Sequence, residues 1–270
     1  MIDTDSYLWS LVVTSPLQEF VMPPAIHALK LPPGSLGLDV GCGIGLQSIL
    51  LAEAVEPAGH ITGIDLSPEF LAYAREIAEK AGMSERISFQ EGDMNNLPFD
   101  KDTFDWVWSA NCAGYTPGEP LPILKELVRV VKPGGSVIII AWSSQQLLPG
   151  YPLLEARLNA TSSGIAPFAR GMRSELHFLR MPGWFREAGM EGITAQTFVG
   201  DFYAPLSDKI RSALTALIEM RWVDVEPELS KEDWIEFQRL CLPESPDFIL
   251  DIPDYYVFFT YSMFQGNVVG

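Results

Sequence analysis

The stretch Leu38-Asp39-Val40-Gly41-Cys42-Gly43-Ile44-Gly45 decides the fold of this 270-residue chain. Residues 36–40 form a short apolar run that predicts a buried strand, and a cluster of alternate glycines follows it. Glycine permits positive φ in a tight turn, and its bare backbone lets a ligand approach closely. The helix expected over residues 47–56 points its free N–H groups into the same crevice. The stretch therefore predicts a ligand site where a first strand passes into a first helix.

Strands and helices alternate from this stretch onward. Ser67 followed by Pro68 marks a helix start, and Gly82 marks the end of that helix. Further strands are predicted at residues 61–64, 87–90, 104–108 and 137–142, with helices at 70–81 and 122–131 and a turn at Lys132–Gly135. The alternation predicts βαβ units and an α/β fold: a Rossmann-like, doubly wound, mostly parallel sheet.

The patterns divide the chain into three expected parts. Residues 1–33 contain several prolines and predict an N-terminal helical segment broken by turns, and residues 34–142 form the Rossmann-like core. Residues 143–270 are expected to hold helical cap insertions and the C-terminal strands that complete the core sheet. Within this last part we expect helices at 182–189 and 207–240, a strand at 193–199 and an aromatic, antiparallel strand at 255–264.

The composition disfavours several classes of partner and site. The chain has 35 acidic and 18 basic residues, a formal net charge of −17, and an acidic surface repels phosphate backbones and anionic membranes. Nucleic acid and membranes are therefore not expected as partners. Three cysteines without CxxC spacing and three scattered histidines predict neither a disulfide framework nor a metal site. The acidic N-terminus is unlike a secretory signal, no apolar run reaches the ~18–20 residues needed to span a bilayer, and we expect a cytoplasmic protein.

Three further loops at the carboxyl ends of predicted strands carry side chains suited to a nucleoside. Asp65 closes the second strand, where its carboxylate could accept hydrogen bonds from both hydroxyls of a ribose. After the third strand, Asp93 could accept from an adenine amino group, and Met94 offers the ring an apolar surface. Asn111 follows the fourth strand at the same edge. One strand-end aspartate is as often a cap or turn residue, but four such elements in order indicate a shared ligand.

The glycine spacing of this chain differs from that of the dinucleotide-binding dehydrogenases. Dinucleotide-binding dehydrogenases favour GxGxxG, whereas this chain has Leu46 where the third glycine of that pattern would stand. Asp39 also precedes the first glycine by two residues. No clear Tyr-Lys pattern of a dehydrogenase is present, so an NAD-dependent oxidoreductase is an alternative that the spacing does not favour.

The run from Leu38 to Trp142 resembles the class I S-adenosylmethionine-dependent methyltransferases. The similarity is greatest to the small-molecule, methyltransferase type 11 branch, which is related to ubiquinone and menaquinone biosynthesis enzymes. The segments that carry it are LDVGCGIG, GIDLSPEFLAYAR, EGDMNNLPF, FDWVWSANCAGY and LKELVRVVKPGGSVII. The resemblance implies S-adenosyl-L-methionine as cofactor and methyl transfer to an O, N or C atom of a small molecule, expected to be apolar or aromatic.

The resemblance also implies which residues bind the cofactor. The glycine motif would contact its methionine portion, Asp65 its ribose, and Asp93 with Met94 its adenine, while the backbone near Asn111 would flank the reacting methyl. The complete set implied is Asp39, Gly41, Cys42, Gly43, Gly45, Asp65, Leu66, Gly92, Asp93, Met94 and Asn111. A cofactor-binding sensor without catalytic activity would carry the same motifs and is a second alternative.

Two differences from the sequence motifs of related families narrow the range of expected substrates. Methyltransferases of nucleic-acid bases carry an Asn/Asp-Pro-Pro-aromatic motif after the fourth strand, and this chain has Asn111-Cys112-Ala113-Gly114-Tyr115 there. This difference and the acidic composition disfavour a protein or RNA methyltransferase. The cysteines also lack the clustering expected of arsenic methyltransferases.

Methyl transfer requires mainly alignment and exclusion of water, although a base helps an oxygen or carbon nucleophile. The candidates for a base are His177 and Tyr115. A tyrosine in that loop is about as often a packing or lid residue, and an exposed histidine often has no role. His60 is expected at the opposite edge of the sheet and is discounted.

The chain after Trp142 is rich in aromatic residues and carries several arginines. The aromatic residues predict mostly a core for the cap helices, with an apolar substrate pocket as the functional alternative. The arginines predict ion pairs on a solvated surface, with Arg170 or Arg173 binding a substrate carboxylate or phosphate as the alternative. A small-molecule methyl acceptor is the expected partner, and a homodimer is a further expectation.

Overall fold

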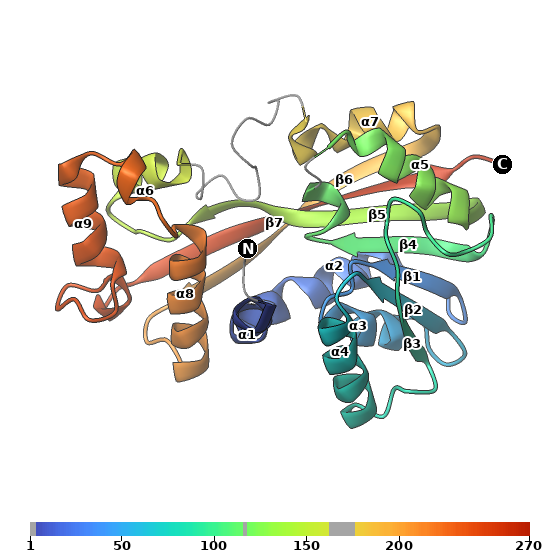
Figure 1. The fold of residues 1–270 in the computed structure, drawn as a ribbon, viewed down its shortest axis with the longest axis horizontal. Helices are drawn as coiled ribbons and strands as arrows, with labels where there is room; N and C mark the ends of the chain where they lie inside the picture. Colours follow the sequence, from blue (N-terminus) through green and yellow to red (C-terminus); the bar gives the residue numbers. More distant parts are fainter. Residues whose placement is uncertain (1–3, 116–117, 162–175) are drawn as a thin grey trace. The chain divides into compact units, whose positions relative to one another are not determined.

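The computed structural model describes residues 4–115, 118–161 and 176–270. Seven strands form one sheet in the order β3-β2-β1-β4-β5-β7-β6 (Figure 1). The strands are β1 (Leu36–Val40), β2 (His60–Asp65), β3 (Ile87–Glu91), β4 (Phe104–Ala110), β5 (Val131–Gln146), β6 (Met190–Tyr203) and β7 (Tyr256–Val268).

The sheet is mostly parallel. The pairs β1–β2, β2–β3, β1–β4 and β4–β5 are all parallel, and the strand order reverses between β1 and β4. In Figure 1, β7 runs opposite to β5 and β6. The predicted α/β, Rossmann-like fold with an antiparallel C-terminal strand is confirmed. In open α/β sheets, ligands bind at the carboxyl ends of the strands beside such a reversal, which here are β1 and β4.

Helices cover both faces of the strands that carry the glycine motif. Side chains alternate along a strand, so Leu38 and Val40 pack with the face covered by α5, while Asp39 between them reaches α3 on the other face. The helices are α1 (Thr4–Thr14), α2 (Met22–Leu29), α3 (Leu46–Ala54), α4 (Pro68–Lys80), α5 (Pro120–Val130), α6 (Pro152–Asn159), α7 (Met181–Glu187), α8 (Asp208–Arg221) and α9 (Lys231–Cys241).

Local signals position these elements. The Ser67 hydroxyl accepts a hydrogen bond from the Phe70 amide at 3.2 Å and caps α4 as predicted, and Gly82 after this helix has φ +70°. Residues 207–240 are helical as predicted and form two helices, α8 and α9. The chain turns between them at Asp224, whose φ of +54° lies in the left-handed region.

The prediction of a turn at Lys132–Gly135 was wrong, because these residues belong to β5. The register between β4 and β5 is irregular at this point, so the extra residues form a bulge within the strand. Gly135 is required there, since an added Cβ would lie 2.3 Å from the carbonyl oxygen of Asp105.

The chain forms two compact units. The core unit comprises Met22–Trp142, Arg173–Phe198 and Tyr261–Gly270. Its interior packs Leu38, Val40 and Val107 of the sheet against α5 and α7. The second unit comprises Met1–Val21, Ser143–Met172 and Val199–Thr260.

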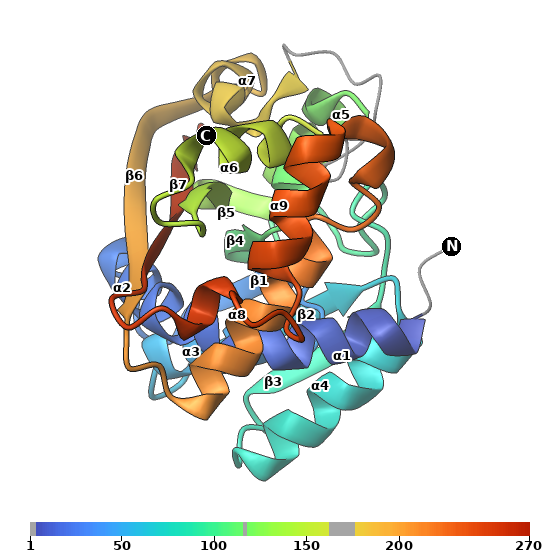
Figure 2. The ribbon, with the colours of Figure 1, turned by 90° about the vertical axis from the view of Figure 1, so that its left-hand side faces the viewer.

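The second unit has an aromatic interior. Trp222 and Phe237 are buried there, with their ring centroids 6.5 Å apart, and α1 packs against α8 (Figure 2). These aromatic residues serve as core, as the sequence predicted. None of the helices in the described ranges is both long and apolar enough to cross a lipid bilayer.

Candidate functional site

The glycine turn connects β1 to α3 and needs its glycines. Gly41, Gly43 and Gly45 have φ of +72°, +51° and +78°, all in the left-handed region. A Cβ added to Gly41 would lie 2.2 Å from Cys112 Sγ, whereas one added to Gly43 would meet nothing within 4 Å. The backbone at Gly43 is therefore open to a ligand.

Asp65 is connected to this turn by its carboxylate. Oδ2 accepts a hydrogen bond from the Gly43 amide at 2.9 Å, and Oδ1 accepts one from the Ser67 amide at 3.0 Å. The end of β2 thus holds both the glycine turn and the start of α4. Each carboxylate oxygen has a further lone pair for a ligand hydroxyl.

Asp39 lies within the core unit and not on its surface. Its side chain is 1% exposed, and Oδ2 accepts a hydrogen bond from Ser48 Oγ at 2.6 Å. Burial raises the pKa of Asp39 to about 7, and the nearby Asp65 charge adds to this rise, while the Ser48 hydrogen bond opposes it. Asp39 therefore stabilises the glycine turn from its buried side, because the hydrogen bond with Ser48 fixes the start of α3.

The loop after β3 contributes one exposed acid and one sulfur. Asp93 is exposed, and its Oδ1 accepts from the Asn95 amide at 2.8 Å and from Asn95 Nδ2 at 2.7 Å, which lowers the pKa of Asp93. The Gly92 amide donates to the Asp65 carbonyl at 3.1 Å. Met94 turns inward, with its Sδ 3.9 Å from Cys112 Sγ. This loop therefore adjoins both Asp65 and the loop after β4.

The loop after β4 lies over the glycine turn. Asn111 has φ +50°, its amide donates to the Ile140 carbonyl at 2.9 Å, and its Oδ1 accepts from the Trp142 amide at 2.9 Å. Cys112 follows and packs against Gly41. Burial, followed by the charges of Asp65 and Asp39, raises the pKa of the Cys112 thiol to about 12, so this thiol is neutral at pH 7.

These contacts join several of the expected residues into one cluster, which we call the cofactor cluster. Its members are Asp39, Gly41, Cys42, Gly43, Asp65, Met94, Asn111 and Cys112. The Asp65 carboxylate and the backbone groups of the turn give the cluster acceptors and donors that suit a ligand with hydroxyl and amino groups. Leu66 lies beside it with its side chain 63% exposed, and Gly45 packs against Phe89 and Ala74.

Sequence reasoning missed two members of this neighbourhood. Cys112 was considered only as a disulfide or metal candidate, although its position after Asn111 in a carboxyl-edge loop was a usable signal. Ser48 carries the hydrogen bond to Asp39 and stands in the first turn of the helix after the glycines. A hydroxyl at that position was visible in the sequence.

The structure places His177 and Tyr115 against the same aromatic ring. The centroid of the Phe178 ring lies 5.4 Å from that of Tyr115 and 5.3 Å from that of His177. The Tyr115 hydroxyl donates to the Trp142 carbonyl. His177 Nδ1 accepts from the Leu179 amide at 3.3 Å, and burial lowers the pKa of this imidazole.

The remaining candidates lie elsewhere. His60 starts β2, far along the strand from the cluster, and its Nε2 lies 3.0 Å from Ser88 Oγ. Arg170 and Arg173 lie outside the described residues. Within the described ranges, no three His, Cys, Asp or Glu side chains come together in a way that could hold a metal ion.

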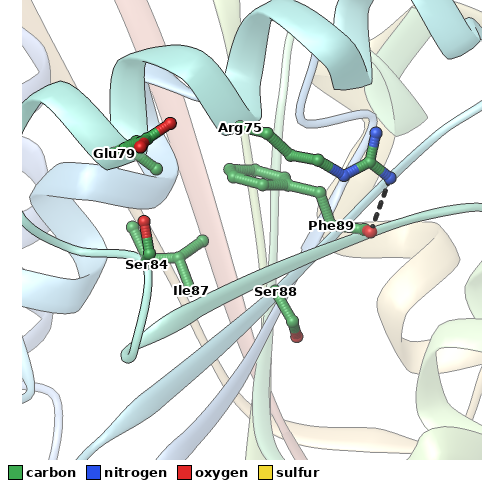
Figure 3. A pocket seen from close by; sticks show the side chains of 7 residues that line it. Arg75, Glu79, Ser84, Ile87, Ser88 and Phe89 are labelled. Carbon is green, nitrogen blue, oxygen red and sulfur yellow. Dashed lines mark hydrogen bonds between the residues drawn. The ribbon is translucent and has the colours of Figure 1, made fainter.

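A pocket of about 310 Å³ lies at the outer edge of the sheet, between α4 and β3 (Figure 3). Arg75 crosses it and donates from Nη2 to the Phe89 carbonyl at 2.9 Å, which occupies an acceptor on the edge strand. Its lining residues are Arg75, Ala78, Glu79, Ser84, Ile87, Ser88 and Phe89, and none of them belongs to the cofactor cluster.

Comparisons with known proteins agree with this geometry. Residues 38–135 match a family model described as a methyltransferase domain. Demethylmenaquinone methyltransferase from Bacillus subtilis is 31% identical over 192 residues, which is 65% of this chain and 79% of that protein. The enzyme of the same name from Bacillus cytotoxicus is 38% identical over 123 residues, 46% of this chain. The chain spans about half of that relative, 51% of its length.

A solved structure shows the same fold over nearly the whole chain. The YcgJ protein from Bacillus subtilis superposes with a TM-score of 0.56 at 17% sequence identity, covering 92% of this chain and 98% of that one. The comparisons do not favour the NAD-dependent alternative. The strand order, the glycine turn and the similarity to the Bacillus enzymes lead to one conclusion: this chain belongs to the class I S-adenosylmethionine-dependent methyltransferases.

Proposed function

We propose that this enzyme methylates a small apolar or aromatic molecule at an O, N or C atom. The observation that carries the assignment of the site is the hydrogen bond from Gly43 to Asp65, because it holds the glycine turn beside the end of β2, where one ligand could contact both. The relatives' names support the substrate class, since demethylmenaquinone is a small apolar compound with an aromatic ring system.

We propose that the cofactor cluster, with Gly45, Leu66, Gly92 and Asp93, binds S-adenosyl-L-methionine. The bound cofactor supplies a methyl carbon that its sulfonium already makes electrophilic. Asp65 would accept from the ribose hydroxyls with the lone pairs that Gly43 and Ser67 leave available. The open backbone at Gly43 allows the methionine portion to approach, and Asp93 with Met94 would receive the adenine.

Asp39 and Asn111 would act through the loops that they fix. Asp39 holds Ser48 at the start of α3, and Asn111 holds the loop after β4 against Trp142. Both hydrogen bonds join groups of the protein itself, so they hold these loops in place. A prearranged site lowers the ordering cost of binding, which supports alignment as the main contribution of this chain.

For an oxygen or carbon nucleophile, we propose His177 as the group that receives the proton. Burial lowers its pKa, so the imidazole is neutral at pH 7, and its Nδ1 contact with Leu179 is long at 3.3 Å. The hydroxyl of Tyr115, the second candidate, donates a hydrogen bond to the Trp142 carbonyl, which supports a positioning role.

Calorimetry and a turnover assay test the proposed function. We expect S-adenosylmethionine and S-adenosylhomocysteine to bind and NAD to give no heat. We also expect S-adenosylhomocysteine to accumulate when demethylated quinols or phenols are supplied as acceptors. Binding without turnover on any acceptor would support the sensor alternative, and no binding of either cofactor form by folded protein would refute the site.

Two further expectations concern the environment of the protein. We propose a cytoplasmic location, which the free thiols of Cys42, Cys112 and Cys241 support, because disulfides are rare in reducing compartments. A homodimer is a prediction that light scattering of the purified protein would test.

A further inference from the structure

Strand β5 continues beyond the end of its neighbour β4. Ala110 of β4 pairs with Ile140, and β4 ends there, whereas β5 runs on to Gln146. The next backbone groups of β5 on this side need hydrogen-bond partners from elsewhere.

The loop after β4, residues 111–115, supplies these partners. The Asn111 amide donates to the Ile140 carbonyl at 2.9 Å, and Asn111 Oδ1 accepts from the Trp142 amide at 2.9 Å. The Tyr115 hydroxyl donates to the Trp142 carbonyl. Both backbone groups of Trp142 are therefore held by side chains from one short loop.

The same loop is packed against the glycine turn. Cys112 fills the space next to Gly41, so that even an added methyl group would lie 2.2 Å from its sulfur. Cys112 Sγ also contacts Met94 Sδ at 3.9 Å, and Ser109 anchors the loop by donating from Oγ to the Val40 carbonyl at 2.9 Å. One end of the loop thus adjoins the cofactor cluster, and the other holds Trp142.

Trp142 is the last residue of β5 within the core unit, and β5 continues as Ser143–Gln146 in the second unit. Its indole ring lies 5.4 Å from the ring of Tyr261, where β7 enters the core unit.

We infer that the loop 111–115 links the cofactor cluster to β5, with Asn111 and Tyr115 as positioning residues that hold Trp142 when the cofactor is bound. The inference rests on the proposed cofactor site. A ligand that contacts the glycine turn restricts Cys112, and the two side-chain hydrogen bonds extend this restriction to the backbone of Trp142. A ligand that orders one part of a packed segment also slows opening of the hydrogen bonds attached to it.

Hydrogen exchange with and without S-adenosylhomocysteine tests this link. In the unchanged protein, the ligand should slow exchange in peptides covering residues 39–48 and in a peptide covering residues 140–146. In Tyr115→Phe, the ring remains but the hydroxyl is lost. We expect affinity for the ligand to stay within about threefold and residues 39–48 to remain protected, while the ligand effect at 140–146 falls by about 5- to 10-fold in rate.

Two further variants show whether a lost ligand effect at 140–146 comes from the broken link or from a general loss of stability. Asn111→Gly tolerates the positive φ but removes the acceptor for the Trp142 amide, and it should also lose the effect at 140–146. Tyr255→Phe removes a comparable hydroxyl-to-carbonyl bond, 3.0 Å long, from Tyr255 to Leu147 within the second unit. This control should keep the ligand effect at Trp142.

The outcomes distinguish this inference from the proposed function. Protection at 39–48 without any at 140–146 in the unchanged protein would overturn the link and leave the cofactor site intact. The same holds if both loop variants keep the full effect at 140–146. If the ligand neither binds nor protects residues 39–48, the proposed site fails and the link fails with it.

Discussion

The Gly43 amide donates a hydrogen bond to Asp65 Oδ2, with the two atoms 2.9 Å apart. Gly43 lies in the turn after β1, and Asp65 is the last residue of the neighbouring parallel strand β2, so the bond joins two segments that are separate in sequence. It also fixes the orientation of the Asp65 carboxylate. The affinity of the proposed cofactor site should therefore depend strongly on this one side chain.

We expect Asp65→Ala to weaken binding of S-adenosylhomocysteine by about 10- to 100-fold, because it removes charged acceptors for the ribose and for the Gly43 amide. Isothermal titration calorimetry measures this change. Glu91→Gln is a matched control, since Glu91 is an exposed carboxylate at the end of β3 and the register partner of Asp65. Equal loss in both variants would show that only the general negative charge matters.

Gly41→Ala and Gly43→Ala should differ in stability but not in their effect on the cofactor. Both positions have positive φ, which costs about 1 kcal/mol for alanine, but only the Gly41 methyl would meet Cys112 at 2.2 Å. Urea unfolding should therefore show a larger loss for Gly41→Ala, by about 1–3 kcal/mol. Calorimetry should show weaker cofactor binding in both. Equal stabilities would contradict the tight packing of Cys112 on Gly41.

Asp39 should make the stability of the protein depend on pH. Its pKa is raised by burial from 3.8 to about 7, so the folded state holds a proton that the unfolded state releases. This contribution is complete below about pH 4 and is lost as the pH rises through about 7. Over that window the loss is on the order of 4 kcal/mol.

The variant Asp39→Asn lacks this titration. Urea unfolding from pH 5 to pH 8 should show the variant gaining stability relative to the unchanged protein as the pH rises. Asp201→Asn, at an exposed position on β6, should give a curve parallel to that of the unchanged protein. A parallel curve for Asp39→Asn as well would show that Asp39 titrates normally in the fold.

His177→Asn separates a proton acceptor from a structural cap. The asparagine oxygen can replace Nδ1 as acceptor for the Leu179 amide but cannot receive a proton at neutral pH. With an oxygen or carbon nucleophile, we expect kcat to fall by about 100-fold and cofactor affinity to stay unchanged.

The pH profile of kcat provides a second measurement. Since burial lowers the pKa of His177, the acid limb of the profile should lie below pH 6.5 and should be absent in His177→Asn. Full activity in His177→Asn with reduced activity in His177→Ala would assign the residue to capping alone.

Local sequence signals were sufficient for much of the fold. The cap at Ser67, the glycine after α4 and the glycine turn were predicted from residues that lie next to one another, because capping and φ preferences act over a few residues. The helix–strand alternation over 36–142 also followed from local apolar patterns, and with it the parallel sheet.

The tertiary structure decided what depends on partners distant in sequence. β5 continues past β4 beside β7, and Asn111 and Tyr115 bond Trp142 from 31 and 27 residues away in the sequence, which no local pattern records. The pKa of Asp39 likewise depends on burial by elements brought together only in the fold. The sequence by itself determined where most of the strands and helices form and which residues reach one sheet edge. The packing of distant segments determined how those residues are held, since hydrogen bonds and desolvation depend on neighbours in space.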